Sequence, residues 1–164
     1  MPARIEIRPI KQKDTTGIAA IIQATLIEFD GNKPGTAFYD TSTTNMFKAY
    51  QGEKEMYFVA LLNDEIIGGC GIKKLDKANP EVCELQKMYL LPKARGLKIG
   101  KQLLDRCIDF ARKSAYKQCY LETFPHMYKA IELYRANGFY TIDQALGSTG
   151  HTACDVWMLK DLKA

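Results

Sequence analysis

The sequence lacks the features that mark several classes of protein. No apolar run approaches the ~18 residues that cross a membrane, and residues 1–9 alternate charged with apolar side chains instead of forming a secretory leader. Internal repeats, low-complexity tracts and an interdomain linker are also missing. We therefore expect a soluble, cytoplasmic protein without a membrane partner, folded as one domain over residues 1–164.

Patterns typical of metal sites are scarce as well. The histidines are His126 and His151, and neither has a cysteine or carboxylate beside it at metal-ligand spacing. The five cysteines are odd in number, lie far apart and form no Cys-x-x-Cys pair. We predict no metal site and interpret the cysteines as buried thiols in a reducing compartment. They are Cys70, Cys83, Cys107, Cys119 and Cys154.

Neither sign of charge is in large excess. The chain has 23 Lys and Arg residues against 19 Asp and Glu residues, a net charge of +4. Nucleic-acid-binding surfaces are typically rich in clustered basic residues interleaved with aromatics, whereas the charges here are spread evenly along the chain. This distribution argues against a nucleic-acid partner, while the mild positive charge would suit a small anionic ligand.

The amino-terminal third is predicted to contain one short strand and two helices. Alternation over residues 4–9 indicates the strand. Asp14 is expected to cap an amphipathic helix that Gly31 ends. A second, short helix is expected between residues 40 and 52. The loop over residues 30–40 is polar yet contains aromatic side chains, so we expect it to cover another part of the protein.

The remainder alternates strands with helices. Strands are predicted over residues 56–62, 65–75, 82–91, 118–123, 139–142 and 153–159, and helices over 97–114 and 125–135. Asn63-Asp64 is a two-residue hairpin signal, and the 147–150 loop predicts another hairpin at the end. The predicted fold class is therefore mixed α/β (α+β), with a mixed, mostly antiparallel sheet flanked by helices on both faces.

One strand-to-helix connection has the character of an anion-binding loop. The chain passes through Arg95 and Gly96 into a helix with Gly100 in its first turn. The start of a helix presents unpaired backbone amides and a partial positive charge, and Lys98 and Lys101 add cationic side chains. A pyrophosphate would fit there, although a helix cap with a solvated basic turn has the same spacing.

Three features make the chain resemble the GNAT acetyltransferase superfamily over nearly its whole length. Residues 84–92 (ELQKMYLLP) with 95–104 (RGLKIGKQLL) are similar to that superfamily's strand and pyrophosphate loop. Residues 130–139 (AIELYRANGF) are similar to its Ala-x-x-Leu-Tyr-x-x-x-Gly-Phe helix and following strand. The order of predicted elements also agrees. The resemblance implies the GNAT fold and acetyl-CoA as co-substrate.

By this resemblance, one strand and one loop would hold coenzyme A. The implied cofactor-binding residues are Met88, Tyr89, Leu90, Arg95, Gly96, Leu97, Lys98, Ile99, Gly100, Lys101, His126 and Tyr134. The strand around Met88 would pair its backbone with the pantetheine amides. The pattern departs from the family at Lys98, where glycine is usual, and at Met127, where asparagine is common. His126 or Tyr128 would then replace the polar contact that Met127 cannot make.

The resemblance also suggests two catalytic residues. Glu84 lies on the strand that leads into the loop, where several family members place a catalytic carboxylate, and we predict that it acts as the general base. A structural ion pair with Arg or Lys is the alternative for Glu84. We predict that Tyr134 gives a proton to the departing thiolate; the alternative is a core aromatic side chain.

The expected reaction is acetyl transfer to a primary amine of a small molecule, a polyamine or a protein. The alternative is a catalytically weak acyl-CoA-binding sensor, suggested by Lys98 and Met127. We expect the acceptor between the loop over residues 31–39 and the terminal loop, where His151 either lines the acceptor side or is a surface histidine. The acceptor, the acyl chain and the oligomeric state, a homodimer included, stay open.

Overall fold

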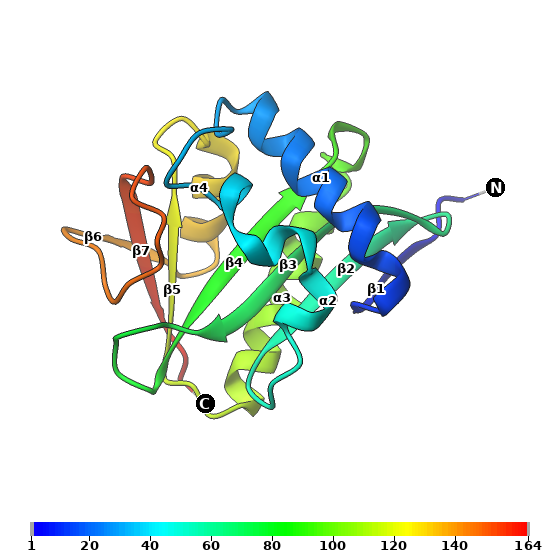
Figure 1. Ribbon diagram of the computed structural model, residues 1–164. Helices are drawn as coiled ribbons and strands as arrows, with labels where there is room; N and C mark the ends of the chain where they lie inside the picture. Colours follow the sequence, from blue (N-terminus) through cyan, green and yellow to red (C-terminus); the bar gives the residue numbers. More distant parts are fainter. Residues whose placement is uncertain (1, 164) are drawn as a thin grey trace.

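The computed structural model describes residues 2–163, which form seven strands in one sheet (Figure 1). Met1 and Ala164, the ends of the predicted domain, lie outside the described residues. The strands are β1 (Ile5–Pro9), β2 (Met56–Leu62), β3 (Glu65–Lys74), β4 (Val82–Leu90), β5 (Gln118–Thr123), β6 (Tyr140–Ile142) and β7 (Val156–Asp161). Their order in the sheet is β1-β2-β3-β4-β5-β7-β6. Among the paired strands, β4 and β5 are parallel and the other pairs are antiparallel, so the predicted mixed, mostly antiparallel sheet is confirmed.

Helices cover both faces of this sheet. In Figure 1, α1 (Thr15–Glu28) and α2 (Met46–Ala49) lie in front of the strands, while α3 (Ile99–Lys113) and α4 (Tyr128–Ala136) lie behind them. Short 3-10 turns connect these elements: η1 (Gln12–Asp14), η2 (Ala37–Tyr39), η3 (Thr41–Thr44) and η4 (Pro92–Ala94). In the described part of the chain, no helix combines the length and apolar character that crossing a membrane requires.

The strand β2 supplies side chains to both hydrophobic cores. Tyr57, Val59 and Leu61 are buried in the cluster that contains α1, whereas Phe58 and Ala60 are buried in the cluster that contains α3. Successive side chains of a strand point to opposite faces, so a continuous apolar run can fill two hydrophobic layers at once. The helices on both faces therefore follow from this run of five apolar residues.

The prediction that the Asp14 side chain caps the helix is wrong. Asp14 is at the N-cap of α1, but its side chain makes no cap hydrogen bond to the helix. Its carboxylate instead accepts hydrogen bonds of 2.7 Å from the Arg8 guanidinium and from the Lys11 amide. A charge-assisted partner on the neighbouring strand outweighs a neutral amide in the helix. Asp14 thus joins α1 to β1.

Several predicted boundaries differ from the structure. The helix expected over residues 40–52 is two short pieces, η3 and α2, separated at Asn45. The helix expected from Pro125 begins at Tyr128, because the Met127 amide first closes a turn on the Phe124 carbonyl at 3.1 Å. The last strand begins at Val156 instead of residue 153, and β7 then inserts between β5 and β6.

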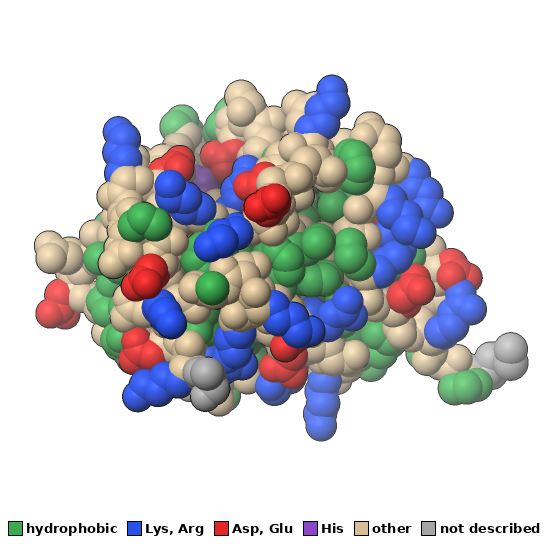
Figure 2. All heavy atoms as spheres, turned by 90° about the horizontal axis from the view of Figure 1, so that it is seen from below, with side chains coloured by type: hydrophobic (Ala, Val, Ile, Leu, Met, Phe, Trp, Pro, Cys, Tyr) green, Lys and Arg blue, Asp and Glu red, His purple; other side chains and the backbone are tan. Residues whose placement is uncertain are grey.

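The cysteines divide into two groups. Cys70, Cys83, Cys107 and Cys119 are free and buried, as predicted, whereas Cys154 is partly exposed. Charged side chains of both signs occupy the surface: Figure 2 shows Lys and Arg side chains lying among Asp and Glu side chains across one face. This mixture agrees with the even charge distribution along the sequence.

Candidate active site

The sheet opens into a wedge between β4 and β5. The two strands pair over three residues only, the last pair being Glu84 and Tyr120. Beyond this point β5 continues to Thr123 beside β7, and β4 continues to Leu90 beside β3. In the described chain, the β4 edge over residues 85–90 therefore has no strand partner on the β5 side. Its backbone is available to pair with an extended ligand.

A β-bulge shapes β4 inside the wedge. Gly69 pairs with Tyr89 while Gly71 pairs with Gln86, so β4 carries one extra residue in this interval. Lys87 in the interval has a left-handed φ of 50°. The buried Tyr57 hydroxyl donates a 2.7 Å hydrogen bond to the Lys87 carbonyl. A β-bulge changes the direction in which the side chains of its strand point. Here the Lys87 side chain, which lies at the bulge, is buried in the site.

Tyr57 holds this bulge because β3 has glycines where the ring lies. A Cβ atom added to Gly69 would lie 2.4 Å from the Tyr57 ring, and one added to Gly71 would lie 2.7 Å from it. Both distances are impossible for a real side chain without movement. Gly69 and Gly71 thus make room for the residue that fixes β4.

One side of the wedge is a cleft of about 690 Å³. Except for Leu97, every residue predicted to bind the cofactor lines this cleft: Met88, Tyr89, Leu90, Arg95, Gly96, Lys98, Ile99, Gly100, Lys101, His126 and Tyr134. Leu97 is 42% exposed and is not among the lining residues. The structure therefore brings residues from β4, α3 and α4 to one cavity.

The cleft contains the amino terminus of α3. The helix begins at Ile99, and its first internal hydrogen bond runs from the Gln102 amide to the Lys98 carbonyl at 3.2 Å. The amides of residues 99–101 consequently have no acceptor inside the helix. Lys98 at the N-cap has a φ of 60°, and Gly96 has a φ of 82°. This left-handed turn directs free amides toward a site suited to an anion.

The Arg95 side chain, to which the resemblance assigns cofactor binding, is paired with a carboxylate of the protein. Its guanidinium forms hydrogen bonds of 2.5 and 2.8 Å with the Glu28 carboxylate and one of 2.9 Å with the Leu90 carbonyl. It also lies over the Phe29 ring, 5.2 Å from the centroid. Arg95 thus ties the end of α1 to the end of β4, and an anion in the cleft would share it with Glu28.

His126 also joins α1 to the other wall of the cleft. Its ring stacks on Phe124 with a centroid distance of 5.3 Å, and its Nε2 atom lies 2.7 Å from the Phe29 carbonyl. Met127 lines the cleft beside it, and Tyr128 is 71% exposed at its rim. The contact with Phe29 indicates that His126 has a positioning role in addition to lining the cavity.

Tyr134 lies where the cleft meets a small inner cavity of about 50 Å³ that is also lined by Glu84. Its side chain is buried, and its hydroxyl is 3.7 Å from the Met88 sulfur. Burial raises the pKa of Tyr134, so the hydroxyl keeps its proton at neutral pH. A thioether is a weak acceptor, which leaves this proton free for a stronger one.

Glu84 is a buried carboxyl with a neutral partner. It is 4% exposed, and its Oε1 atom accepts a 2.7 Å hydrogen bond from the Gln86 side-chain amide. Burial raises its pKa to about 7, against the opposing effect of the Gln86 hydrogen bond. No Arg or Lys forms an ion pair with Glu84 among residues 2–163, so the structural alternative has no support from the contacts. Near neutral pH the group can both accept and release a proton.

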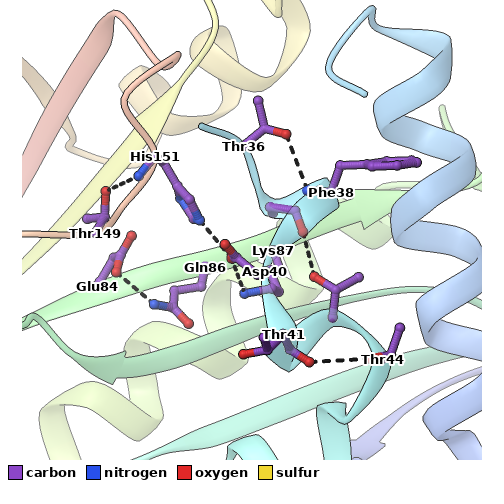
Figure 3. Close-up of polar contacts among 12 residues, drawn as sticks. Thr36, Phe38, Asp40, Thr41, Thr44, Glu84, Gln86, Lys87, Thr149 and His151 are labelled. Atoms are coloured by element: carbon purple, nitrogen blue, oxygen red, sulfur yellow. Dashed lines mark hydrogen bonds and ion pairs between the residues drawn. The ribbon is translucent and has the colours of Figure 1, made fainter. Parts of the chain in front are cut away.

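On the far side of Glu84 lies a polar network that the sequence did not reveal. The His151 Nε2 atom is 2.7 Å from the Asp40 carboxylate, and the Lys87 ammonium is 3.0 Å from the same oxygen (Figure 3). Burial opposes ionisation of Asp40, but the hydrogen bond from His151 and the charge of Lys87 outweigh it and lower the Asp40 pKa. Asp40 in turn raises the pKa of His151 despite burial of the ring.

Glu122 completes this network. The Tyr120 hydroxyl donates a 2.6 Å hydrogen bond to one of its oxygens, and the Thr149 hydroxyl donates to the other. One potential ligand atom from each of Glu84, Glu122 and His151 lies within 4.8 Å of the others. Each carboxylate oxygen has two lone pairs, so Glu122 keeps acceptor capacity beside these two hydrogen bonds. The three residues come from β4, β5 and the loop before β7, so sequence spacing could not have grouped them.

A polar cavity of about 480 Å³ opens beside this network. It is lined by Asp40, Thr41, Ser42, Glu55, Lys73, Lys74, Asp76, Glu84, Gln86, Lys87, Ser148, Thr149 and His151. The two loops expected to border the acceptor contact each other nearby, where the Ala153 amide donates to the Gly35 carbonyl at 3.1 Å. His151 is therefore a cavity residue and not a free surface histidine.

Known proteins share this architecture. The model of the acetyltransferase (GNAT) family matches residues 19–139. The uncharacterized N-acetyltransferase YjgM of Escherichia coli is 36% identical over 157 residues, which are 95% of this chain and 94% of that protein.

Solved structures extend the comparison to three dimensions. A GNAT-family acetyltransferase of Staphylococcus aureus has a TM-score of 0.84 at 24% identity, over 98% of this chain and 100% of that chain. The PaiA N-acetyltransferase of Thermoplasma acidophilum, in complex with coenzyme A, has a TM-score of 0.69 at 20% identity, over 96% of this chain and 99% of that chain. The fold predicted from the sequence is thereby confirmed.

Proposed function

Because the chain belongs to the GNAT acetyltransferase family, we propose that it transfers an acetyl group from acetyl-CoA to a primary amine. The observation that carries the proposal is a path of three neighbouring cavities in the wedge, each of which shares lining residues with the next. The path leads from the amide-rich cleft, past Tyr134 and Glu84, to the polar cavity beside His151. The PaiA neighbour, which contains coenzyme A, supports the same use of the cleft.

The donor side fits coenzyme A by its chemistry. Three amides of residues 99–101 point out of the helix start, where a pyrophosphate is best stabilised. The unpaired edge of β4 around Met88 offers backbone groups to an amide-containing arm. At Gly100 an added Cβ would already stand 3.3 Å from the Met88 side chain, so a larger residue would crowd the inner wall. When bound, acetyl-CoA supplies an acetyl thioester.

The acceptor amine must lose a proton before it can attack a carbonyl carbon. An amine with a pKa near ~10.4 is only ~0.04% neutral at pH 7, which corresponds to roughly 4.6 kcal/mol. In our proposal the Glu84 carboxylate takes this proton, directly or through a water molecule. A pKa of about 7 makes Glu84 half ionised at neutral pH and able to pass the proton on to solvent.

The departing sulfur must gain a proton or a hydrogen bond. Tyr134 lines both the cleft and the inner cavity, and its hydroxyl has only the Met88 sulfur as a partner among the described residues. We assign to this hydroxyl the transfer of a proton to the sulfur. One proton of the ammonium thus leaves through Glu84, and the thiol gains one from Tyr134, which is reprotonated as the new amide forms.

A binding protein without turnover is the second candidate. It is favoured by the pairing of Arg95 with Glu28 and by the left-handed backbone of Lys98, a position where glycine would be unstrained. Both features depart from a glycine-rich loop with a free arginine, while the amides at the helix start remain available to an anion, so binding without efficient turnover is the form that this candidate takes.

One experiment separates the two candidates. The protein is incubated with acetyl-CoA and a panel of amines comprising amino acids, diamines, polyamines and lysine peptides, and free CoA and acetylated products are measured by mass. Release of CoA with an acetylated amine supports the enzyme. Thermal stabilisation by acetyl-CoA without any product supports the sensor and contradicts acetyl transfer.

A further inference from the structure

We propose that Glu122, Glu84 and His151 form a binding site for the ammonium group of the acceptor, and that the acceptor is a small polar primary amine. The inference rests on the proposed function, because it assigns the acceptor end of the same path. It concerns recognition and not the proton transfer itself.

The first support is an imbalance of charge. Three carboxylates, Asp40, Glu84 and Glu122, meet here, and Lys87 is the one lysine that pairs with any of them in the described chain. Asp40 takes both Lys87 and His151 as partners. Glu84 is buried and Glu122 is partly buried, and no cationic side chain among residues 2–163 pairs with either, so both carboxylates are available to a cation from outside.

The second support is the kind of partner that the other two carboxylates have. Glu122 accepts hydrogen bonds from two hydroxyl groups, those of Tyr120 and Thr149, and Glu84 accepts one from the amide of Gln86. All these donors are neutral. They fix the orientation of both carboxylates without cancelling their charge, which is the arrangement expected of groups held ready for a cationic ligand.

The third support is the spacing. Carboxylate oxygens that accept hydrogen bonds of ~2.8 Å from one ammonium nitrogen stand about 4.6 Å apart in tetrahedral geometry. One ligand atom from each of Glu84, Glu122 and His151 lies within 4.8 Å of the other two. A single ammonium group can therefore contact both carboxylates and lie against the His151 ring, whose Nε2 atom is held by Asp40.

Asp40 and Lys87 act as positioning residues for this site. The hydrogen bond between Asp40 and His151 joins the turn before η3 to the loop before β7 (Figure 3). The Thr149 hydroxyl, which donates to Glu122, also accepts a 3.1 Å hydrogen bond from the His151 amide. The ring and the carboxylate are consequently held by the same loop.

The polar cavity limits what the rest of the acceptor can be. Its outer lining contains both cations, such as Lys73 and Lys74, and anions, such as Glu55 and Asp76. A long alkyl chain would gain little there, whereas hydroxyl, amide or carboxylate substituents would find partners of either sign. An amine with a polar body fits this lining best.

Binding of matched pairs of small molecules tests the inference without turnover. Each pair consists of a primary amine and the analogue with a hydroxyl in its place: an α-amino acid and its 2-hydroxy acid, ethanolamine and ethylene glycol, a diamine and its diol. Affinity is measured by calorimetry on the full chain saturated with CoA, which has no acetyl group to transfer. We expect at least one amine to bind ten times more tightly than its hydroxyl partner.

Substitution of Glu122 then locates the effect. Glu122→Gln keeps the shape and one hydroxyl donor and removes the charge, while the other hydroxyl must turn to accept from the new amide. We expect amine affinity to fall at least tenfold while CoA affinity is unchanged. Glu122→Asp, which retains the charge, should recover part of the affinity. Glu81→Gln, the same change at an exposed residue just before β4, is the control and should behave like the wild type.

The inference is overturned if no amine binds, if hydroxyl analogues bind as tightly, or if Glu122→Gln binds amines as the wild type does. The comparison of an amine with its hydroxyl analogue uses the wild-type protein, so it still tests the inference if Glu122→Gln fails to fold. Amine binding without release of CoA from acetyl-CoA would contradict the proposed function and leave this inference standing. Turnover of an amine whose KM is the same in Glu122→Gln would contradict this inference and leave the proposed function standing.

Discussion

The cleft beside α3 and the polar cavity beside His151 are made of different kinds of structure. In the cleft, the groups that would hold the donor are largely backbone: the open edge of β4 and the amides of residues 99–101, which lie in one stretch of chain. The cavity depends on side chains from five segments of the chain, among them Asp40, Glu84 and His151. A ligand common to a whole family can be held by backbone, whereas selection among acceptors requires side chains.

This difference predicts that single substitutions on the cavity side will cost far more activity than those at the cleft. The largest effect is expected for Glu84→Gln. We expect kcat to fall by roughly 10²–10⁴ because the general base is lost, with acetyl-CoA affinity unchanged. Steady-state kinetics with calorimetry for acetyl-CoA checks this expectation.

The pH profile of the same variant sharpens the assignment. In the wild type the rate should rise with pH and level off above about 7, the pKa of Glu84, because the ionised form accepts the proton. This inflection should be absent in Glu84→Gln. An inflection that survives the substitution would assign the base to another group.

A smaller loss of activity is expected for Tyr134→Phe, at the junction of the two regions. Removing the hydroxyl should lower kcat by about 10- to 100-fold, because the sulfur then leaves without a proton from the protein. KM for both substrates should change little. The ring remains packed against Phe139, so the thermal midpoint should stay near that of the wild type. Unchanged turnover would remove Tyr134 from the mechanism.

The stability of the protein should also report the burial of Glu84. Its pKa is raised from 4.5 to about 7 on folding, so the folded state binds more protons than the unfolded state between these values. The free energy of unfolding should therefore fall as pH rises through this window, by at most about 3 kcal/mol, and this term should be constant above it.

Denaturant titrations across this range test the linkage. Glu84→Gln lacks the titrating group, so its stability relative to the wild type should rise from pH 4.5 to 7. A difference that is independent of pH would mean that Glu84 ionises in the folded protein as it does in water.

The smallest effects are expected on the cleft side, at Lys98. Lys98→Gly and Lys98→Ala both remove the charge, but only glycine relieves the left-handed φ of 60°. We expect the glycine variant to be more stable than the alanine variant by about 1 kcal/mol. Acetyl-CoA affinity should fall by only a few-fold, and equally, in both variants. Loss of binding in either variant would show that the side chain, and not the backbone, holds the anion.

Local features were predictable where neighbouring residues decide the structure. The Asn63-Asp64 hairpin has left-handed φ angles of 50° and 69°, as a two-residue turn between twisted strands requires. The strand over residues 118–123 agrees with β5 at both ends. In contrast, Asp14 and Pro125 were misjudged because a partner on β1 and a preceding turn decided their roles.

The sequence by itself determined the elements, the two-sided sheet, the loop before α3 and the family. These depend on side-chain periodicity, turn residues and a contiguous motif, which are properties of short stretches of chain. Only the tertiary structure decided that Arg95 pairs with Glu28 and that His151 meets Asp40 111 residues away. Contacts of this kind depend on where distant loops come together in the fold, and the spacing of neighbouring residues in the sequence does not determine that arrangement.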